Sequence, residues 1–224
     1  MGRFFPQFLC FVHLGRLSYL SLLFFRTLHS NEYLSFSPLP FTSLLFIAIC
    51  KPSSDSHFAF LHFFSMDVQT AADTLTVIID DDGCGMTAEQ VAAVTDPFFT
   101  TRTTRKVGLG VPFFKQAAES TGGSFSIEST VGVGTRVTAV FTLSHIDRMP
   151  LGDMNGTIHT LVTMHEECDF LYTFRFNEKE FSLDTREFRE VLGDISFTEP
   201  EVSLYIKDYL RENFNETNDD TFEL

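Results

Sequence analysis

Downstream of the first third of the chain, apolar and polar residues follow patterns typical of regular secondary structure. Residues Leu75–Ile79 are apolar or β-branched and have polar neighbours on both sides, which predicts a buried strand. Three carboxylates and two glycines over residues 80–85 then predict a turn. Thr87 and Gln90 have the spacing of a capping box, so the pattern predicts a helix over Ala88–Val94.

The same reasoning predicts a mixture of helices and strands over the rest of the chain. Pro112 suits the first turn of a helix, and glycine pairs separate the elements around it. The predicted helices are Pro112–Ser120, Thr157–Glu166, Arg186–Leu192 and Pro200 to about Asn213. The predicted strands are Ser124–Ser129, Arg136–Leu143, Asp169–Phe176 and Glu180–Leu183. The acidic residues 216–224 are predicted to be a disordered tail.

The first 64 residues differ in composition from the rest. They hold 13 of the 27 phenylalanines and have a net charge of +2, whereas the following 160 residues have a net charge of −16. Their apolar runs Leu17–Phe25 and Phe41–Cys50 are shorter than the roughly 18–20 residues of a membrane-spanning helix. We expect a domain boundary near residue 65.

Three interpretations of residues 1–65 stay open. The segment is a membrane anchor, a divergent packed subdomain, or sequence that is not natural to the domain behind it. The abrupt change at Ser65 and Met66, where Met66 would be an internal start, favours the third interpretation. A membrane role is the second expectation, and a packed subdomain is the least favoured.

Charge and cysteine content exclude several classes of protein. A formal net charge of −14 argues against a protein that coats DNA or RNA, because the phosphate backbone is bound by Lys and Arg. The four cysteines have no metal-binding or disulfide spacing, which fits a reducing compartment and predicts a cytoplasmic protein. A nucleotide remains a compatible ligand, because a small phosphate group needs only local donors.

Four motifs in the middle of the chain lie in a fixed order. They are DxGxG at Asp81–Gly85 followed by Met86, DPFFTT at Asp96–Thr101, GLG at Gly108–Gly110 and GTR at Gly134–Arg136. Together they resemble the GHKL ATPases, which include gyrase, a heat-shock chaperone, bacterial sensor histidine kinases and a mismatch-repair protein. Four motifs on the expected elements are far more specific than a single glycine pattern.

The resemblance implies an α/β fold, a two-layer sandwich of the Bergerat type over residues 66–143, with ATP as ligand. Asp81 occupies the family's adenine-reading position, where a carboxylate accepts hydrogen bonds from the exocyclic amine. Thr135 resembles the threonine beside that aspartate. Gly83 and Gly85 let the backbone approach the base, where a Cβ would collide. By contrast, the neighbouring Asp80 is expected to be a solvated turn residue.

The resemblance also implies a phosphate side to the site. Gly108 and Gly110 can present backbone N–H groups at the start of a helix, and Lys106 adds positive charge. Phe98 is expected to anchor the lid over the site by packing. The complete set of predicted ATP-binding residues is Asp81, Gly83, Gly85, Met86, Phe98, Thr100, Thr101, Lys106, Gly108, Leu109, Gly110 and Thr135.

One expected element of the family is missing from the sequence. Members that bind Mg-ATP have an Asn on a helix some thirty to fifty residues before the DxGxG motif, and this Asn holds the magnesium. The only Asn before residue 155 is Asn31, whose neighbours do not match that motif. Mg²⁺ is therefore expected for the family without an identified ligand in this chain.

Residues His145–Leu151 resemble the phosphoacceptor box of sensor kinases only superficially. The acid stands one position late, and Pro150 interrupts any helix that begins there. We therefore interpret the similarity as coincidence.

The sequence predicts four parts: residues 1–65, an ATP-binding domain over 66–143, a small α/β extension over 144–215 and an acidic tail over 216–224. The family implies phosphoryl transfer to a protein or slow ATP hydrolysis. The alternatives are a nucleotide-sensing or scaffold module without catalysis, and a membrane-tethered fragment of a sensor kinase. A protein substrate or partner is expected both for the phosphoryl-transfer hypothesis and for the sensing or scaffold hypothesis.

Overall fold

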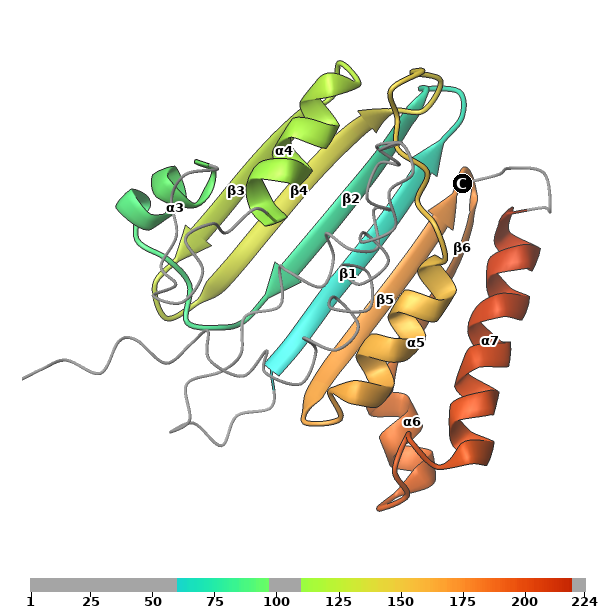
Figure 1. Ribbon diagram of the computed structural model, residues 1–224. Coiled ribbons are helices and arrows are strands. Elements are labelled where there is room, and N and C mark those ends of the chain that lie inside the picture. Colours follow the sequence, from blue (N-terminus) through green and yellow to red (C-terminus); the bar gives the residue numbers. More distant parts are fainter. Residues whose placement is uncertain (1–59, 97–109, 219–224) are drawn as a thin grey trace, which may run out of the picture.

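A single six-stranded sheet organises the chain in the computed structural model, which describes residues 60–96 and 110–218 (Figure 1). The strands are β1 (Phe60–Gln69), β2 (Thr74–Asp81), β3 (Ser124–Thr130), β4 (Gly134–Thr142), β5 (Cys168–Phe176) and β6 (Lys179–Asp184). The helices are α3 (Ala88–Val94), α4 (Gly110–Ser120), α5 (Met154–Met164), α6 (Thr185–Leu192) and α7 (Pro200–Asn218). The predicted α/β fold class is confirmed.

The strands lie in the order β3-β4-β2-β1-β5-β6. All neighbours are antiparallel except β1 and β5, which are parallel. Parallel neighbours need a long crossover, and here the chain passes through six other elements, with β3 and β4 among them, before β5 joins β1. The two central strands are therefore β2 and β1, and β2 carries the DxGxG motif at its end.

One face of the sheet is covered by helices and the other is more open. Figure 1 shows α4 lying over β3 and β4, and α5 and α7 lying over the β5–β6 side. Side chains alternate along the strands, as the period of two requires, with every second residue buried under the helices. We call this covered side the inner face. Its centre is fully apolar: Met66, Val77 and Phe174 are each 0% exposed.

Strand β1 crosses the predicted boundary between Ser65 and Met66 without interruption. Its alternation of buried residues begins at His62 and continues through Phe64, Met66 and Val68. This strand was not predicted from the sequence, because the outward-facing Phe63 hides the alternation. Moreover β1 pairs on one side with β2 and on the other with β5, so the predicted ATP-binding domain and the predicted extension share one sheet.

The predicted local elements agree with the structure to within a few residues, except at the C-terminal end. The capping box at Thr87 and Gln90 is present, with both of its hydrogen bonds, and Asp184 caps α6. Helix α7, however, continues to Asn218, and Thr217 and Asn218 are buried. The prediction of a disordered tail is therefore wrong for residues 216–218. In the described ranges no helix is both long enough and apolar enough to cross a membrane.

Candidate functional site

The predicted adenine-reading carboxylate lies at the carboxyl end of a central strand. Asp81 is the last residue of β2 and belongs to the inner face, where its side chain is 9% exposed. Its Oδ1 accepts a hydrogen bond from the backbone N–H of Gly83 at 3.0 Å. The carboxylate is thus held by the turn that follows it.

Burial raises the pKa of Asp81, because removal from water disfavours the charged form. The hydrogen bond from Gly83 acts in the opposite direction by stabilising the charge, and the neighbouring carboxylates Asp80 and Asp82 raise the pKa further. The side chain therefore sits in the sheet at a cost in free energy. A buried carboxylate with free acceptor positions is a strong site for a ligand that donates hydrogen bonds.

A row of polar side chains crosses the sheet at the level of Asp81. In the strand register Asp81 is opposite His62 of β1 on one side and Thr135 of β4 on the other. Thr135 is in turn opposite Ser129 of β3, and His62 is opposite Phe170 of β5. Because directly opposed residues point to the same face, these five side chains lie at one level of the inner face. We call the four polar ones, His62, Asp81, Thr135 and Ser129, the polar row.

Two hydroxyl groups in the polar row hold the loop after β2. The Oγ of Ser129 accepts from the backbone N–H of Met86 at 2.7 Å, and it donates to the carbonyl oxygen of Gly134 at 3.0 Å. The Oγ1 of Thr135 lies 2.9 Å from the Ser129 Oγ. Since a serine hydroxyl has one hydrogen, Thr135 is the donor in this pair and keeps its lone pairs for a ligand.

The loop after β2 also packs closely on the β3–β4 turn. Gly85 has a φ of +61°, and a Cβ at this position would lie 2.0 Å from the carbonyl oxygen of Thr130. The backbone N–H of Gly132 donates to the carbonyl oxygen of Cys84 at 2.8 Å. A glycine is therefore required at position 85 by the fold itself, whereas the predicted approach of Gly83 and Gly85 to a base stays a prediction.

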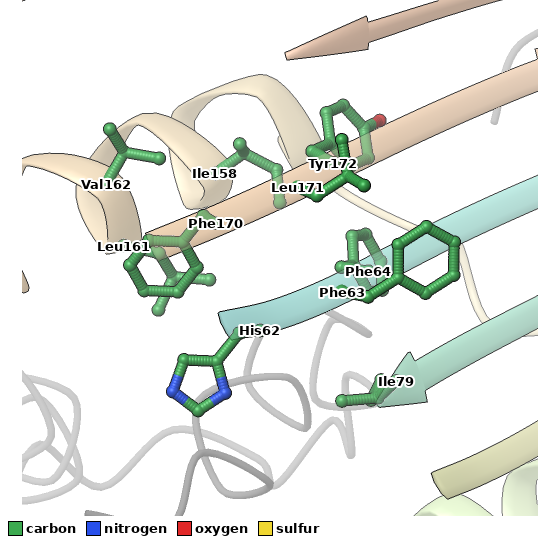
Figure 2. Close-up of a pocket in the computed structure, with 10 residues that line it drawn as sticks. All are labelled: His62, Phe63, Phe64, Ile79, Ile158, Leu161, Val162, Phe170, Leu171 and Tyr172. Carbon is green, nitrogen blue, oxygen red and sulfur yellow. The ribbon is translucent and has the colours of Figure 1, made fainter. Parts of the chain in front are cut away.

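His62 is the second titratable group of the polar row. Its side chain is 5% exposed, and its ring stacks on Phe170 with the centroids 5.4 Å apart. Figure 2 shows it near the start of β1, beside Leu161 of α5. Burial lowers the pKa of His62, with the charge of His165 adding to this effect and that of Asp82 opposing it, so the imidazole is neutral at pH 7.

Helix α4 extends from the far end of the sheet back towards the end that holds the polar row (Figure 1). Its last turn lies against the far end of β4, because Gly123, which follows it, packs on the carbonyl of Val140. Its eleven residues span about 16 Å, so the helix begins partway along the sheet, and its first turn points towards the Asp81 end (Figure 1). The backbone N–H groups of its first turn give this end of the helix a partial positive charge.

Part of the predicted site lies outside the described residues. Asp81, Gly83, Gly85, Met86 and Thr135 are described and lie at one end of the sheet, and Gly110 begins α4 partway along it. The predicted residues Phe98, Thr100, Thr101, Lys106, Gly108 and Leu109 are outside the described ranges. Within residues 60–96 and 110–218, no three His, Cys, Asp or Glu side chains come together to form a metal site, so no ligand set for Mg²⁺ is found there.

The structure corrects one expectation and adds two residues. Asp80 is not a solvated turn residue: it faces away from Asp81 on the outer side of β2 and pairs with Arg136, its cross-strand neighbour. His62 and Ser129 were missed by the sequence analysis. His62 could have been found from its spacing, because it alternates with Phe64 and Met66 on one face of a strand. Ser129 follows only from the strand register, which no local pattern in the sequence encodes.

Comparison with known proteins identifies similarities over the middle of the chain. Residues 57–145 match the family described as histidine kinase-, DNA gyrase B-, and HSP90-like ATPase. Over 83 residues the chain is 34% identical to a protein named putative sensor protein from Shewanella frigidimarina (strain NCIMB 400), covering 37% of this chain and 13% of the relative. Over 78 residues it is 28% identical to a probable C4-dicarboxylate sensor kinase of Bacillus subtilis (strain 168), covering 35% of this chain and 15% of the relative.

The chain thus spans only a small part of the length of these two curated relatives. Among solved structures, the histidine kinase domain of the Erythrobacter litoralis EL346 blue-light activated histidine kinase is similar, with a TM-score of 0.33 and 20% sequence identity. That similarity covers 43% of this chain and 38% of the other.

Proposed function

We propose that the chain binds ATP at the Asp81 end of its sheet, because residues 57–145 match the family described as histidine kinase-, DNA gyrase B-, and HSP90-like ATPase. The observation that carries the proposal is the buried carboxylate of Asp81, held at the end of β2 by the Gly83 N–H. Its remaining acceptor positions suit the exocyclic amine of adenine. The lone pairs of Thr135 beside it add a second acceptor.

The position of α4 supports an orientation for the triphosphate. The positive end of this helix points towards the Asp81 end of the sheet, and it suits the negative charge of phosphate groups. The base would then bind at the polar row and the phosphates would extend towards Gly110. Lys106, Gly108 and Leu109 precede that helix in sequence and are proposed to complete the phosphate side.

Two activities are compatible with ATP binding at this site. In the first, the chain transfers the terminal phosphoryl group to a protein or hydrolyses ATP slowly, as its family implies. In the second, it senses the nucleotide without turnover, which the sequence favours because Asn31 is the only Asn before residue 155. Release of phosphate over hours in the presence of Mg²⁺ would support the first, and binding without release the second.

The test is equilibrium binding of a non-hydrolysable ATP analogue with and without Mg²⁺. Asp81→Asn is expected to weaken binding at least about tenfold, because the amide cannot match a carboxylate as an acceptor of charge-assisted hydrogen bonds. Asp80→Asn is the matched control: it makes the same chemical change one residue away, on the outer face, and should leave binding unchanged. Equal affinity of the wild-type protein and Asp81→Asn would contradict the proposal.

A further inference from the structure

The polar row stands out from the rest of the inner face of the sheet. The next three rows of opposed residues across β2, β1 and β5 are Ile79, Phe64 and Tyr172, then Val77, Met66 and Phe174, then Leu75, Val68 and Phe176. In these nine positions the only polar atom is the phenol oxygen of Tyr172. The chain therefore places an imidazole and a carboxylate side by side at one end of an apolar sheet, which a purely structural core does not need.

The imidazole of His62 has a hydrogen-bonding group without a partner. Among the described residues nothing donates to or accepts from its Nε2, although the side chain is 95% buried. A buried polar atom without a partner lowers stability by about 1–3 kcal/mol, so such atoms are rare and often belong to sites that bind something. The ring is fixed by its stack on Phe170, which leaves the Nε2 little freedom to find a partner elsewhere.

The space beside His62 is small. A cavity of about 30 Å³ is lined by His62 together with apolar side chains such as Ile79 and Leu161 (Figure 2). It has room for a water molecule and not for a nucleobase. A nucleobase that contacts His62 therefore lies outside this cavity, and Asp81 is the polar side chain opposed to His62 across β1 and β2.

His62 and Asp81 are close enough to bind one ligand together. Opposed residues on neighbouring antiparallel strands have Cβ atoms about 4.5–5.5 Å apart, and both side chains belong to the inner face. We propose that His62 is a specificity-determining residue of the nucleotide site, where its Nε2 hydrogen-bonds the purine base whose amine is bound by Asp81. This inference rests on the proposed function and adds to it a residue outside the sequence motifs.

The proposal has a consequence for the pH dependence of binding. The groups around the imidazole are Asp81 on β2, Asp82 in the following loop and His165 after α5, while the α5 side chains that line its cavity, Ile158, Leu161 and Val162, are apolar. When His62 is protonated, the imidazolium is attracted to the Asp81 carboxylate and competes with the adenine amine for it. ATP affinity should therefore fall as the pH falls through the pKa of His62.

The test compares two variants at His62 with the wild-type protein, using a fluorescent non-hydrolysable ATP analogue between about pH 8 and about pH 5.5. His62→Phe keeps the packing on Phe170 and removes the hydrogen bond, so it should weaken binding roughly three- to tenfold at pH 8. His62→Gln keeps a hydrogen-bonding side chain that does not titrate. It should bind within about twofold of wild type at pH 8 and lose less affinity than wild type on acidification.

The outcomes separate the two proposals. If Asp81→Asn weakens binding while both His62 variants match the wild-type protein at every pH, the role of His62 is overturned and the ATP site stands. If the wild-type protein itself does not bind the analogue, both proposals fail. Circular dichroism checks that each variant is folded, and His62→Gln carries the test alone if His62→Phe does not fold.

Discussion

The carboxylate of Asp81 is buried in the fold, although burial removes it from the water that would stabilise its charge. Side chains alternate along β2, so its last residue, Asp81, belongs to the inner face. The preceding inward residues, Ile79 and Val77, are apolar, whereas Asp81 has a carboxylate. Backbone hydrogen bonds from Gly83 and Thr135 stabilise the charged form, but they compensate only in part for the loss of water. Such an arrangement favours binding at the expense of stability.

We predict that Asp81→Asn stabilises the folded protein at neutral pH by about 1 kcal/mol, because a neutral amide is less costly to bury and still accepts from Gly83. The pKa of Asp81 is raised by burial, so between about pH 3.9, where an unfolded aspartate titrates, and the folded pKa, the folded state binds more protons than the unfolded state. Wild-type stability must fall as the pH rises through this window.

Urea denaturation of the wild-type protein and Asp81→Asn at a series of pH values measures this effect. The difference in the free energy of unfolding should be largest at neutral pH and should shrink as the pH falls through the folded pKa of Asp81. Asp80→Asn serves as control, since it removes an exposed ion pair with Arg136 and should lower stability by no more than about 1 kcal/mol. If the wild-type protein were more stable than Asp81→Asn at pH 7, burial of the charged carboxylate would not lower the free energy of unfolding, and the prediction would be wrong.

At the scale of elements, features that depend on neighbouring residues could be predicted from the sequence, whereas features that depend on long-range contacts could not. The helix after the DxGxG motif followed from the capping box at Thr87 and Gln90, because a cap is a contact between residues three apart. The polar row could not be found in that way. Ser129 and Asp81 are 48 positions apart, and only the pairing of β3, β4 and β2 brings them to one level.

The loop that carries the DxGxG motif depends on the β3–β4 turn beneath it. We predict that Gly85→Ala lowers the free energy of unfolding by about 3 kcal/mol or more, because the added Cβ meets both a positive φ and the Thr130 carbonyl oxygen at 2.0 Å. Gly132→Ala is the control. Gly132 has a φ of +78°, but a Cβ there would meet no other atom. Its substitution should therefore lower the free energy of unfolding only by the backbone strain of a positive φ, about 1–2 kcal/mol. Equal losses in thermal denaturation would show that the close contact is unimportant.

For the whole molecule, the central question is whether the two halves of the sheet form one folding unit. A change in composition predicted a boundary near residue 65, and the extent of the family resemblance predicted another near residue 143. The structure instead places β1 between β2 of the first part and β5 of the second, with a parallel pairing between residues more than one hundred positions apart. No local pattern in the sequence reports such a pairing, because its two strands carry no signal of which partner they will take.

Strand β1 links the halves through side chains that are completely buried. Met66 is 0% exposed and is opposed by Val77 of β2 on one side and Phe174 of β5 on the other. If the sheet is one cooperative unit, a cavity at Met66 lowers the stability of strands on both sides by the same amount. If the extension folds by itself, one side retains its stability.

We predict that Met66→Ala lowers the free energy of unfolding by about 2–5 kcal/mol and that hydrogen exchange reports the same loss in β4 and in β6, the outer neighbours of β2 and β5. The reason is that neither half retains a covered inner face once β1 detaches. Ile146→Ala, at a side chain that is 94% exposed, is the control and should change neither strand. Loss of protection confined to one half would mean that the chain contains two folding units joined at β1, and ATP binding would then need only the half that holds Asp81.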